Sequence, residues 1–402
     1  MSMRTALAPL LALTLAASAG VASATTPAPV GVKPDNVDLL RWTEPQREFG
    51  FRHMESVFPT HPVRRGWRAH PLPKGDAVSL PGADTLFDKE DAAAVLVVQD
   101  GRIRFERYGR GYGPDQKWTS FSVAKSFTST LLGAAILDRK IKSIDDQIVT
   151  YLPELKGSAY DGVSVRQLLT MTSGVKWNED YADPKSDVAL IGQQPVVKGK
   201  DATIEYMRKL PRETAPGSKF VYKTGETNLV GVLVSRVTGK SLAEYLQHKI
   251  WIPYGMEQDG IWLTDANGQE PGGFGLSVAA HDYARMGQFV LDGGSGVVPT
   301  WWFGMAGSKQ ADIGQPGFGY GFQWWTRDDG AFDARGIFGQ MIHIDPRRKL
   351  IVVINSDWDK ATGREHSAAR EAFLKSVNAA VDAAPQAPQE EPQPVIGKSL
   401  HG

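Results

Sequence analysis

The chain has 402 residues with 45 Lys and Arg against 45 Asp and Glu, so its formal net charge at pH 7 is zero. That balance argues against nucleic acid or an anionic membrane as a partner, because both favour an excess of basic residues. The absence of cysteine excludes disulfides, thiolate metal sites and a cysteine nucleophile, so we expect a large hydrophobic core, in two lobes, to hold the fold together.

The first residues predict a signal peptide. Arg4 precedes an apolar run over residues 6–17, and Ala22-Ser23-Ala24 offers a small-x-small cleavage site. We expect residues 1–24 to be removed and the mature protein to be exported, either periplasmic or secreted. No later segment has the apolar length of a transmembrane helix, so we expect no integral membrane segment after cleavage.

Residues 25–85 are rich in Pro, Arg and aromatic side chains and show weak periodicity, which predicts an N-terminal arm that wraps the body of the protein. The pattern changes at residue 92. The apolar segment 95–99 and the segment 102–108, in which apolar and charged residues alternate, flank Asp100-Gly101. Asp-Gly between two such segments is typical of a β-hairpin turn.

The middle of the chain is predicted to be helical. A helix begins at Ser122, and Asp145-Asp146 would supply negative charge near the N-terminus of the next. Ser241 and Glu244 form a capping-box pattern. The further helices are expected at residues 143–152, 165–171, 203–210, 228–237, 241–250 and 278–291.

Strands return near the C-terminus. Segments 339–344 and 350–355 predict a second hairpin, an amphipathic helix follows over 367–381, and the Pro/Gln/Glu-rich tail 383–402 is expected to be disordered. Early and late strands with helices between them predict an α+β fold, with an antiparallel sheet flanked by helices. We place one domain over 86–382, interrupted by a helical insertion at about 140–250, with a site in the cleft between the two.

Ser122-Val123-Ala124-Lys125 is the spacing with the clearest chemical meaning. Residues three apart share a helical face, so the amine of Lys125 can reach the hydroxyl of Ser122. A serine hydroxyl needs a neighbouring base, and a desolvated lysine can lose enough basicity to serve as one. The pattern predicts a nucleophile, Ser122, with Lys125 as its base.

The same spacing occurs once more, at Ser173 and Lys176. There Gly174 follows the serine directly, and Thr172-Ser173-Gly174 is typical of a helix end. A lysine beyond such an end does not share a helical face with Ser173. We therefore interpret Ser173 as a loop residue.

Four segments in order, 122–127, 179–184, 222–224 and 336–340, make the chain resemble the serine hydrolases of the class C β-lactamase fold. Within them it is most similar to 6-aminohexanoate-dimer hydrolases and related carboxylesterases. The similarity extends from about residue 90 to 375. It implies a β-lactamase/penicillin-binding-protein-like fold and an acyl-enzyme mechanism.

The resemblance also implies roles for individual residues. Tyr222 would be the third catalytic residue, and a phenol beside a lysine ammonium ionises more easily. The backbone N–H groups of Ser122 and Ile337 would bind the oxyanion.

Three further side chains are substrate-binding candidates. By resemblance Tyr181 would contact the substrate amide, and Thr224 would contact substrate or Lys125. Trp325 or its neighbour Trp324 could wall an apolar pocket, but adjacent strand residues face opposite sides, so one of them is expected in the core.

One departure from the family bears on the substrate. Lys223-Thr224-Gly225 spells a β-lactamase motif but overlaps the tyrosine segment, and the expected late position holds Ala334-Arg335-Gly336. The lysine that would hold a β-lactam carboxylate is therefore missing or replaced by Arg335. This argues against β-lactamase or D-Ala-D-Ala peptidase activity and favours a linear substrate.

The eight histidines lack ligand spacing, so we predict no metal and no cofactor. His343, which alternates with two isoleucines, is interpreted as structural. The sequence predicts a serine hydrolase that cleaves an amide or ester of a small linear molecule. The alternatives are a penicillin-interacting enzyme and a catalytically silent binding or sensor protein of the same fold; the oligomeric state stays open.

Overall fold

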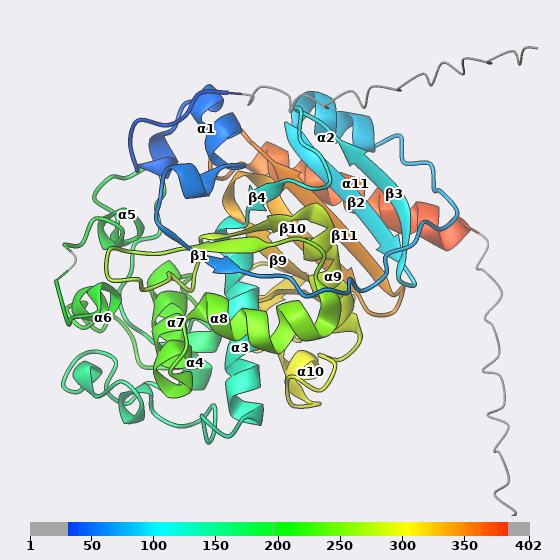
Figure 1. Ribbon diagram of the computed structural model, residues 1–402. Helices are drawn as coiled ribbons and strands as arrows, with labels where there is room; N and C mark the ends of the chain where they lie inside the picture. The colour runs from blue at the N-terminus through cyan, green and yellow to red at the C-terminus, as the bar shows by residue number, and fades with distance from the viewer. Residues whose placement is uncertain (1–30, 196, 385–402) are drawn as a thin grey trace, which may run out of the picture.

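A computed structural model describes residues 31–195 and 197–384 (Figure 1). The predicted signal peptide 1–24 lies outside the described residues, as does the predicted tail from residue 385 onward. No helix within the described ranges is both long and apolar enough to cross a membrane.

A seven-stranded antiparallel sheet forms the centre of one half of the molecule, with the strand order β3-β2-β11-β10-β9-β8-β7. Of its early strands, β2 pairs with β11 from the end of the chain and β3 pairs with β2, so early and late strands share one sheet, as the sequence predicted. The bounds are β2 Ala92–Gln99, β3 Arg102–Tyr108, β7 Phe318–Tyr320, β8 Trp325–Arg327, β9 Phe332–Gly336, β10 Gln340–Asp345 and β11 Leu350–Ser356.

Both predicted hairpins are confirmed. Asp100 and Gly101 have φ values of 50° and 69°, which suit the tight turn that joins β2 to β3. Strand β2 is buried on both faces because helices cover both sides of the sheet. Its alternate residues pack in two clusters, of which one includes Phe373 of α11 and the other includes Phe289 of α9.

Helix α3 (Ala124–Leu137) runs between α7 (Thr224–Thr238) and the large sheet, as Figure 1 shows. Residues 124–135 of α3 are all buried, so the helix that carries Lys125 is a central element of the core. The other α-helices are α1 Glu44–Gly50, α2 Ala83–Lys89, α4 Val165–Leu169, α5 Asp187–Ile191, α6 Ala202–Met207, α8 Leu242–Leu246, α9 Ala280–Leu291, α10 Trp302–Ala306 and α11 Arg364–Ala383.

A second, four-stranded sheet was not predicted. Its order is β1-β5-β6-β4, with β1 Thr60–Val63, β4 Lys117–Thr119, β5 Gly260–Leu263 and β6 Leu276–Ala279. Strand β4 ends just before the nucleophile segment, and β6 occupies the start of the expected helix 278–291. These strands are only three or four residues long, too short for a periodic pattern to reveal.

The predicted helix 143–152 is wrong. Only short 3-10 turns, η4 (Ile148–Thr150) and η5 (Pro153–Leu155), occur in this region. Asp146 accepts hydrogen bonds from Ser143 N (3.2 Å) and the Tyr151 hydroxyl (2.5 Å), so its side chain stabilises a turn in place of a helix. No helix begins at Asp145 either. Its side chain forms an ion pair with Arg166 at 2.6 Å.

The predicted helix 241–250 also differs. Ser241 accepts the Glu244 N–H at 3.1 Å and caps α8, as the capping pattern indicated. Beyond α8 the chain continues as a wider π-helical segment, Gln247–Gly255, which contains Pro253. The predicted helical insertion 140–250 contains α4 to α8, and its boundaries stay a prediction.

Candidate active site

The nucleophile candidate and its base meet where a 3-10 turn becomes a helix. Ser122 lies in η3 (Phe121–Val123), and Lys125 lies in the first turn of α3. Lys125 Nζ is 2.9 Å from Ser122 Oγ. The exposed fraction is 9% for Ser122 and 1% for Lys125, so the amine is kept from bulk water.

Two further groups fix the amine of Lys125. Its Nζ also donates to Thr224 Oγ1 at 3.0 Å and to the Gly273 carbonyl at 2.9 Å. Burial lowers the pKa of Lys125 to about 8, although the carboxylate of Glu179 opposes this shift. Near neutral pH part of the population therefore carries a neutral amine, which can accept the Ser122 proton through the same 2.9 Å contact.

Tyr222 lies beside this pair. The Lys125 Nζ is 5.0 Å from the centre of the Tyr222 ring, which stacks on Trp325 at 5.3 Å. Burial and the charge of Glu179 raise the pKa of Tyr222, and a hydrogen bond with Ser122 only partly opposes them. The expected easier ionisation of this phenol is therefore wrong, because burial is the largest influence on its pKa. Tyr222 is therefore protonated at neutral pH.

Glu179 is the site residue that sequence reasoning missed. Its carboxylate accepts the Thr224 N–H at 2.9 Å and the Tyr181 hydroxyl at 2.8 Å. It also accepts hydrogen bonds from the Thr224 hydroxyl and the Trp177 indole. The segment 179–184 was noted for Tyr181, and the acid two residues before that tyrosine was the available signal.

The three substrate-binding candidates occupy different positions. Tyr181 is half-buried, and its hydroxyl is held by Glu179. Thr224 is buried and bridges Lys125 to Glu179, so its observed contacts are with the catalytic candidates. Trp325 is half-buried against Tyr222, whereas Trp324 is fully buried against Phe332, which confirms that the adjacent tryptophans face opposite sides.

The proposed oxyanion donors lie on neighbouring elements. Gly336, at the end of β9, is so close to η3 that a Cβ there would be 2.6 Å from the Ser120 carbonyl. The turn η7 (Ile337–Gly339) follows directly, so the fold brings Ile337 next to the Ser122 segment. Within the described residues, neither the Ser122 N–H nor the Ile337 N–H donates to a protein acceptor, which leaves both for a ligand.

Neither basic residue of the β-lactamase-like motifs is free to bind a carboxylate. Lys223 is fully buried, donates to the Val221 carbonyl at 3.1 Å and lies 3.7 Å from Glu226. Arg335 donates to Asp333 through Nε at 2.9 Å and contacts Glu371 at 3.4 Å. Both cations are already paired with protein carboxylates.

The other candidates are structural. Ser173 is a buried loop residue bonded to Glu226, whereas Lys176 is exposed, so the second Ser-x-x-Lys spacing does not make a pair. His343 is buried and contacts Asp333 at 2.6 Å, as expected of a structural histidine. In the parts of the chain that the structure describes, no group of three His, Asp or Glu side chains is arranged to hold a metal ion.

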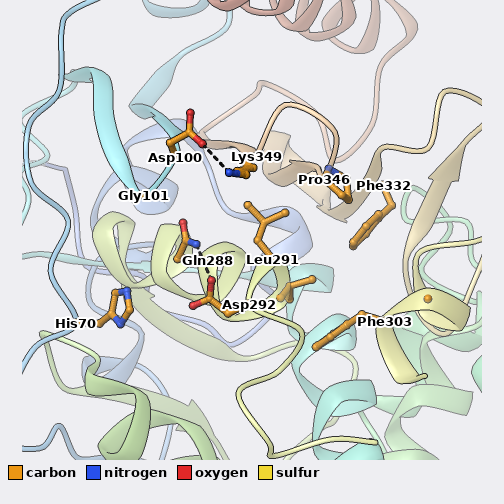
Figure 2. A pocket seen from close by; sticks show the side chains of 12 residues that line it. His70, Asp100, Gly101, Gln288, Leu291, Asp292, Phe303, Phe332, Pro346 and Lys349 are labelled. Carbon is orange, nitrogen blue, oxygen red and sulfur yellow. Dashed lines mark hydrogen bonds and ion pairs between the residues drawn. The ribbon is translucent and has the colours of Figure 1, made fainter. Parts of the chain in front are cut away.

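A separate cavity of about 890 Å³ opens beside the β2–β3 turn, α9 and α10 (Figure 2). None of the site residues lines it. Its polar groups pair with one another, as Asp100 does with Lys349 at 3.4 Å and Gln288 with Asp292 at 2.9 Å.

A serine next to a buried lysine, at the junction of an antiparallel sheet and a helical region, defines a serine hydrolase of the β-lactamase fold. The sequence profile of the Beta-lactamase family matches residues 83–376, and the chain belongs to that family.

Within this family, the chain is similar to individual proteins whose activity or structure has been described. The chain is 31% identical to the 6-aminohexanoate-dimer hydrolase of Paenarthrobacter ureafaciens, over 86% of this chain and 94% of that one. A solved structure described as a 6-aminohexanoate-dimer hydrolase from Bacillus anthracis superimposes with a TM-score of 0.77 at 25% identity, covering 89% of this chain and 100% of that one. A class C β-lactamase, with a TM-score of 0.55 and 16% identity over 76% of this chain and 95% of its own, shares the fold.

Proposed function

We propose that the protein cleaves an amide or ester bond of a small linear substrate through an acyl-enzyme. The substrate would be an amide like a 6-aminohexanoate oligomer or a short-chain ester. The observation that carries the proposal is the 2.9 Å contact between Ser122 Oγ and the buried Lys125 Nζ, whose pKa lies near 8.

In the acylation step, Ser122 Oγ attacks the substrate carbonyl carbon while its proton passes to the neutral amine of Lys125. The N–H groups of Ser122 and Ile337 bind the oxygen that becomes negative. Tyr222, which is protonated, donates its proton to the leaving amine or alcohol and regains one from the Lys125 ammonium. The carbon–heteroatom bond breaks, and the acyl group stays on Ser122.

In deacylation a water molecule takes the place of the leaving group. Tyr222 takes a proton from this water as it passes its own proton to the neutral amine of Lys125. The hydroxide attacks the acyl carbonyl, and Ser122 leaves with the proton that the Lys125 ammonium returns. The proposed cycle requires no cofactor.

A linear substrate is favoured over a β-lactam by the pairing of the nearby cations. Arg335 is engaged by Asp333 and Glu371, and Lys223 is buried against Glu226. A β-lactam carboxylate would have to compete with these protein carboxylates for either cation. A linear substrate without a carboxylate near the scissile bond does not need either cation.

The test is hydrolysis of three substrates in parallel: a short-chain nitrophenyl ester, the linear 6-aminohexanoate dimer and a chromogenic cephalosporin. We expect turnover of the ester or the dimer, and its loss in Ser122→Ala with the fold retained. Substantial turnover by Ser122→Ala would contradict the assigned nucleophile. Turnover of the cephalosporin alone would show that Arg335 or Lys223 can serve a β-lactam carboxylate.

Covalent labelling distinguishes the proposed hydrolase from a catalytically silent binding protein of the same fold. A serine-reactive phosphonate should modify Ser122 of the wild-type protein, because Lys125 activates the hydroxyl. Lys125→Ala should label much more slowly and lose kcat, since it lacks the base. No labelling of the wild type, together with no turnover, would favour the binding protein.

A further inference from the structure

The two residues that flank the proposed oxyanion donors have unusual backbone conformations. Phe121, just before Ser122, has φ 43°, and Phe338, just after Ile337, has φ 57°. Left-handed conformations are unfavourable for bulky side chains and persist where the surroundings enforce them.

The aromatic side chains of these two residues pack on each other and on the N-terminal arm. The ring centres of Phe121 and Phe338 are 5.2 Å apart. Phe51, which follows α1 in the arm, lies 5.0 Å from Phe121 and 5.3 Å from Phe338. All three rings are almost completely buried, so Phe51 joins the two halves of the oxyanion site from behind.

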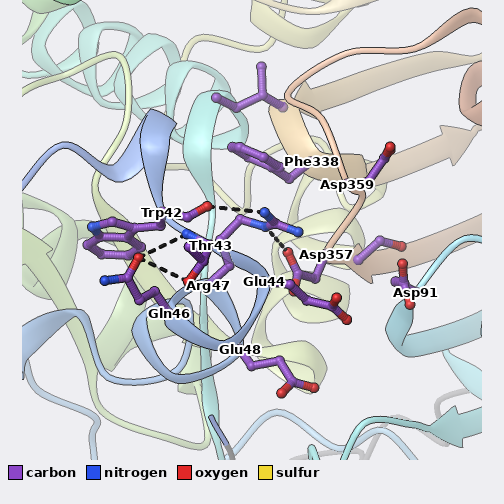
Figure 3. Close-up of polar contacts among 12 residues, drawn as sticks. Trp42, Thr43, Glu44, Gln46, Arg47, Glu48, Asp91, Phe338, Asp357 and Asp359 are labelled. Carbon is purple, nitrogen blue, oxygen red and sulfur yellow. Dashed lines mark hydrogen bonds and ion pairs between the residues drawn. The ribbon is translucent and has the colours of Figure 1, made fainter. Parts of the chain in front are cut away.

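A second arm residue supports the same turn. The guanidinium of Arg47 lies 5.5 Å from the centre of the Phe338 ring. Arg47 Nε donates to the buried Asp357 at 2.6 Å, and its Nη1 donates to the Trp42 carbonyl at 3.2 Å. Figure 3 shows Arg47 reaching from the arm toward Asp357, with Phe338 beside it.

Backbone hydrogen bonds tie the arm to the nucleophile segment as well. The Thr119 N–H donates to the Phe51 carbonyl at 2.8 Å, three residues before Ser122. On the other side, the Phe338 N–H donates to the Ala361 carbonyl at 2.9 Å. The arm is thus hydrogen-bonded to the segment before Ser122, whereas its contact with the turn that carries Ile337 is the packing of Phe51 and Arg47 on Phe338.

We propose that the N-terminal arm, through Phe51 and Arg47, is a positioning element of the oxyanion site. It fixes the separation and direction of the Ser122 and Ile337 N–H groups and touches no reacting atom. This inference rests on the proposed function. Oxyanion donors act only when they are aimed at the charge that develops in the transition state, so their misplacement lowers kcat more than it weakens substrate binding.

The test compares Phe51→Leu with Phe289→Leu. Both phenylalanines are fully buried beside other aromatic rings, but Phe289 of α9 packs on Tyr254 of the π-helical segment and on Phe303 of α10, away from the site. At a temperature where both variants are folded, Phe51→Leu should lower kcat about 10- to 100-fold with KM nearly unchanged. Phe289→Leu should keep the wild-type kcat. Equal kcat in Phe51→Leu and wild type would overturn the proposal.

Arg47 is tested by Arg47→Gln and Arg47→Lys. The glutamine variant should lose kcat, and the lysine variant should recover part of it because it restores a cation beside Asp357 and Phe338. Loss of stability without loss of kcat in Arg47→Gln would mean that the arm is only structural.

Amide hydrogen exchange over residues 336–340 gives a readout that needs no substrate. Exchange should be faster in Phe51→Leu than in the wild type and unchanged in Phe289→Leu. If the wild type neither turns over a substrate nor reacts with the phosphonate, the proposed function fails while exchange still tests the arm. Unchanged exchange in Phe51→Leu would overturn the positioning role by itself.

Discussion

At the scale of single residues, the chemistry of the site depends on how burial and charge share control of Lys125. Burial lowers the pKa of its amine to about 8, and Glu179 acts in the opposite direction. The amine of Lys125 becomes mostly neutral above this pKa, so kcat should rise with pH through about 8 and then level off. Tyr222 stays protonated over this range because burial raises its pKa.

Glu179→Gln tests this balance directly. Removing the carboxylate charge removes the effect that raises the pKa of Lys125, so the acid limb of the kcat profile should move to lower pH. Tyr181→Phe is the matched control, because it removes a hydrogen bond to Glu179 and leaves the charge in place. A limb that stays fixed in Glu179→Gln, or moves to higher pH, would contradict the assignment of Lys125 as the base.

Site residues that are close in sequence could be predicted from their spacing, whereas those brought together only by folding could not. Ser122 and Lys125 are neighbours along one helix, so their spacing alone indicates the 2.9 Å contact. Glu179 acts through partners that include Thr224, 45 residues later, and such contacts exist only after folding. The prediction for Tyr222 was wrong because it considered only the nearby lysine charge. How deeply the phenol is buried is known only from the folded structure.

At the scale of elements, the packing of α3 can be tested at its internal glycine. A Cβ on Gly133 would lie 2.7 Å from the ring of the buried Trp302 in α10. Alanine should gain about 1 kcal/mol of helix propensity but lose about 1–3 kcal/mol through overpacking, so Gly133→Ala should lower the free energy of unfolding. Urea denaturation of the purified variant measures the difference.

Gly304, in α10, is the matched control. No atom lies within 4 Å of a Cβ built there. Gly304→Ala should therefore leave stability unchanged or raise it by up to about 1 kcal/mol. A stabilised Gly133→Ala would show that Trp302 moves aside, and that α3 is less tightly packed than its complete burial indicates.

Elements with local signals were predicted, and elements formed by distant pairing were not. The hairpins are encoded by turn residues and alternation, and α4 and α8 by their caps. Strands β1 and β4 are short and owe their conformation to partners about 160 to 200 residues away. The predicted helix 143–152 does not form because the side chain of Asp146 accepts the Ser143 N–H and so competes with helical backbone hydrogen bonds.

At the scale of the whole molecule, one buried carboxylate joins the large sheet to the C-terminal helix. Asp333 in β9 is fully buried and contacts Arg327 of β8 at 2.8 Å and His343 of β10 at 2.6 Å. Arg327 also bonds Glu371 of α11 at 2.6 Å. Burial alone would raise the pKa of Asp333, but Arg335, Arg327 and His343 together hold it well below its usual range.

This network predicts how stability depends on pH. Because the folded-state pKa of Asp333 lies below its unfolded value, the ionised carboxylate stabilises the fold above about pH 4, and that contribution is lost as the pH falls further. Asp333→Asn should lower the free energy of unfolding at pH 7 by about 3–5 kcal/mol, since it removes the fully buried carboxylate and leaves Arg327 and Arg335 to share Glu371. The deficit should shrink when the pH is lowered below about 4.

Asp84→Asn provides the comparison, because Asp84 forms an exposed ion pair with Arg107 at 2.6 Å. Exposed pairs contribute about 0–1 kcal/mol, so this variant should unfold nearly as the wild type does at every pH. Urea denaturation of both variants at several pH values, from well below about 4 up to 8, measures how the free energy of unfolding depends on pH. A deficit in Asp333→Asn that is independent of pH would mean that shape and hydrogen bonding, not the charge of Asp333, hold β8, β9 and α11 together.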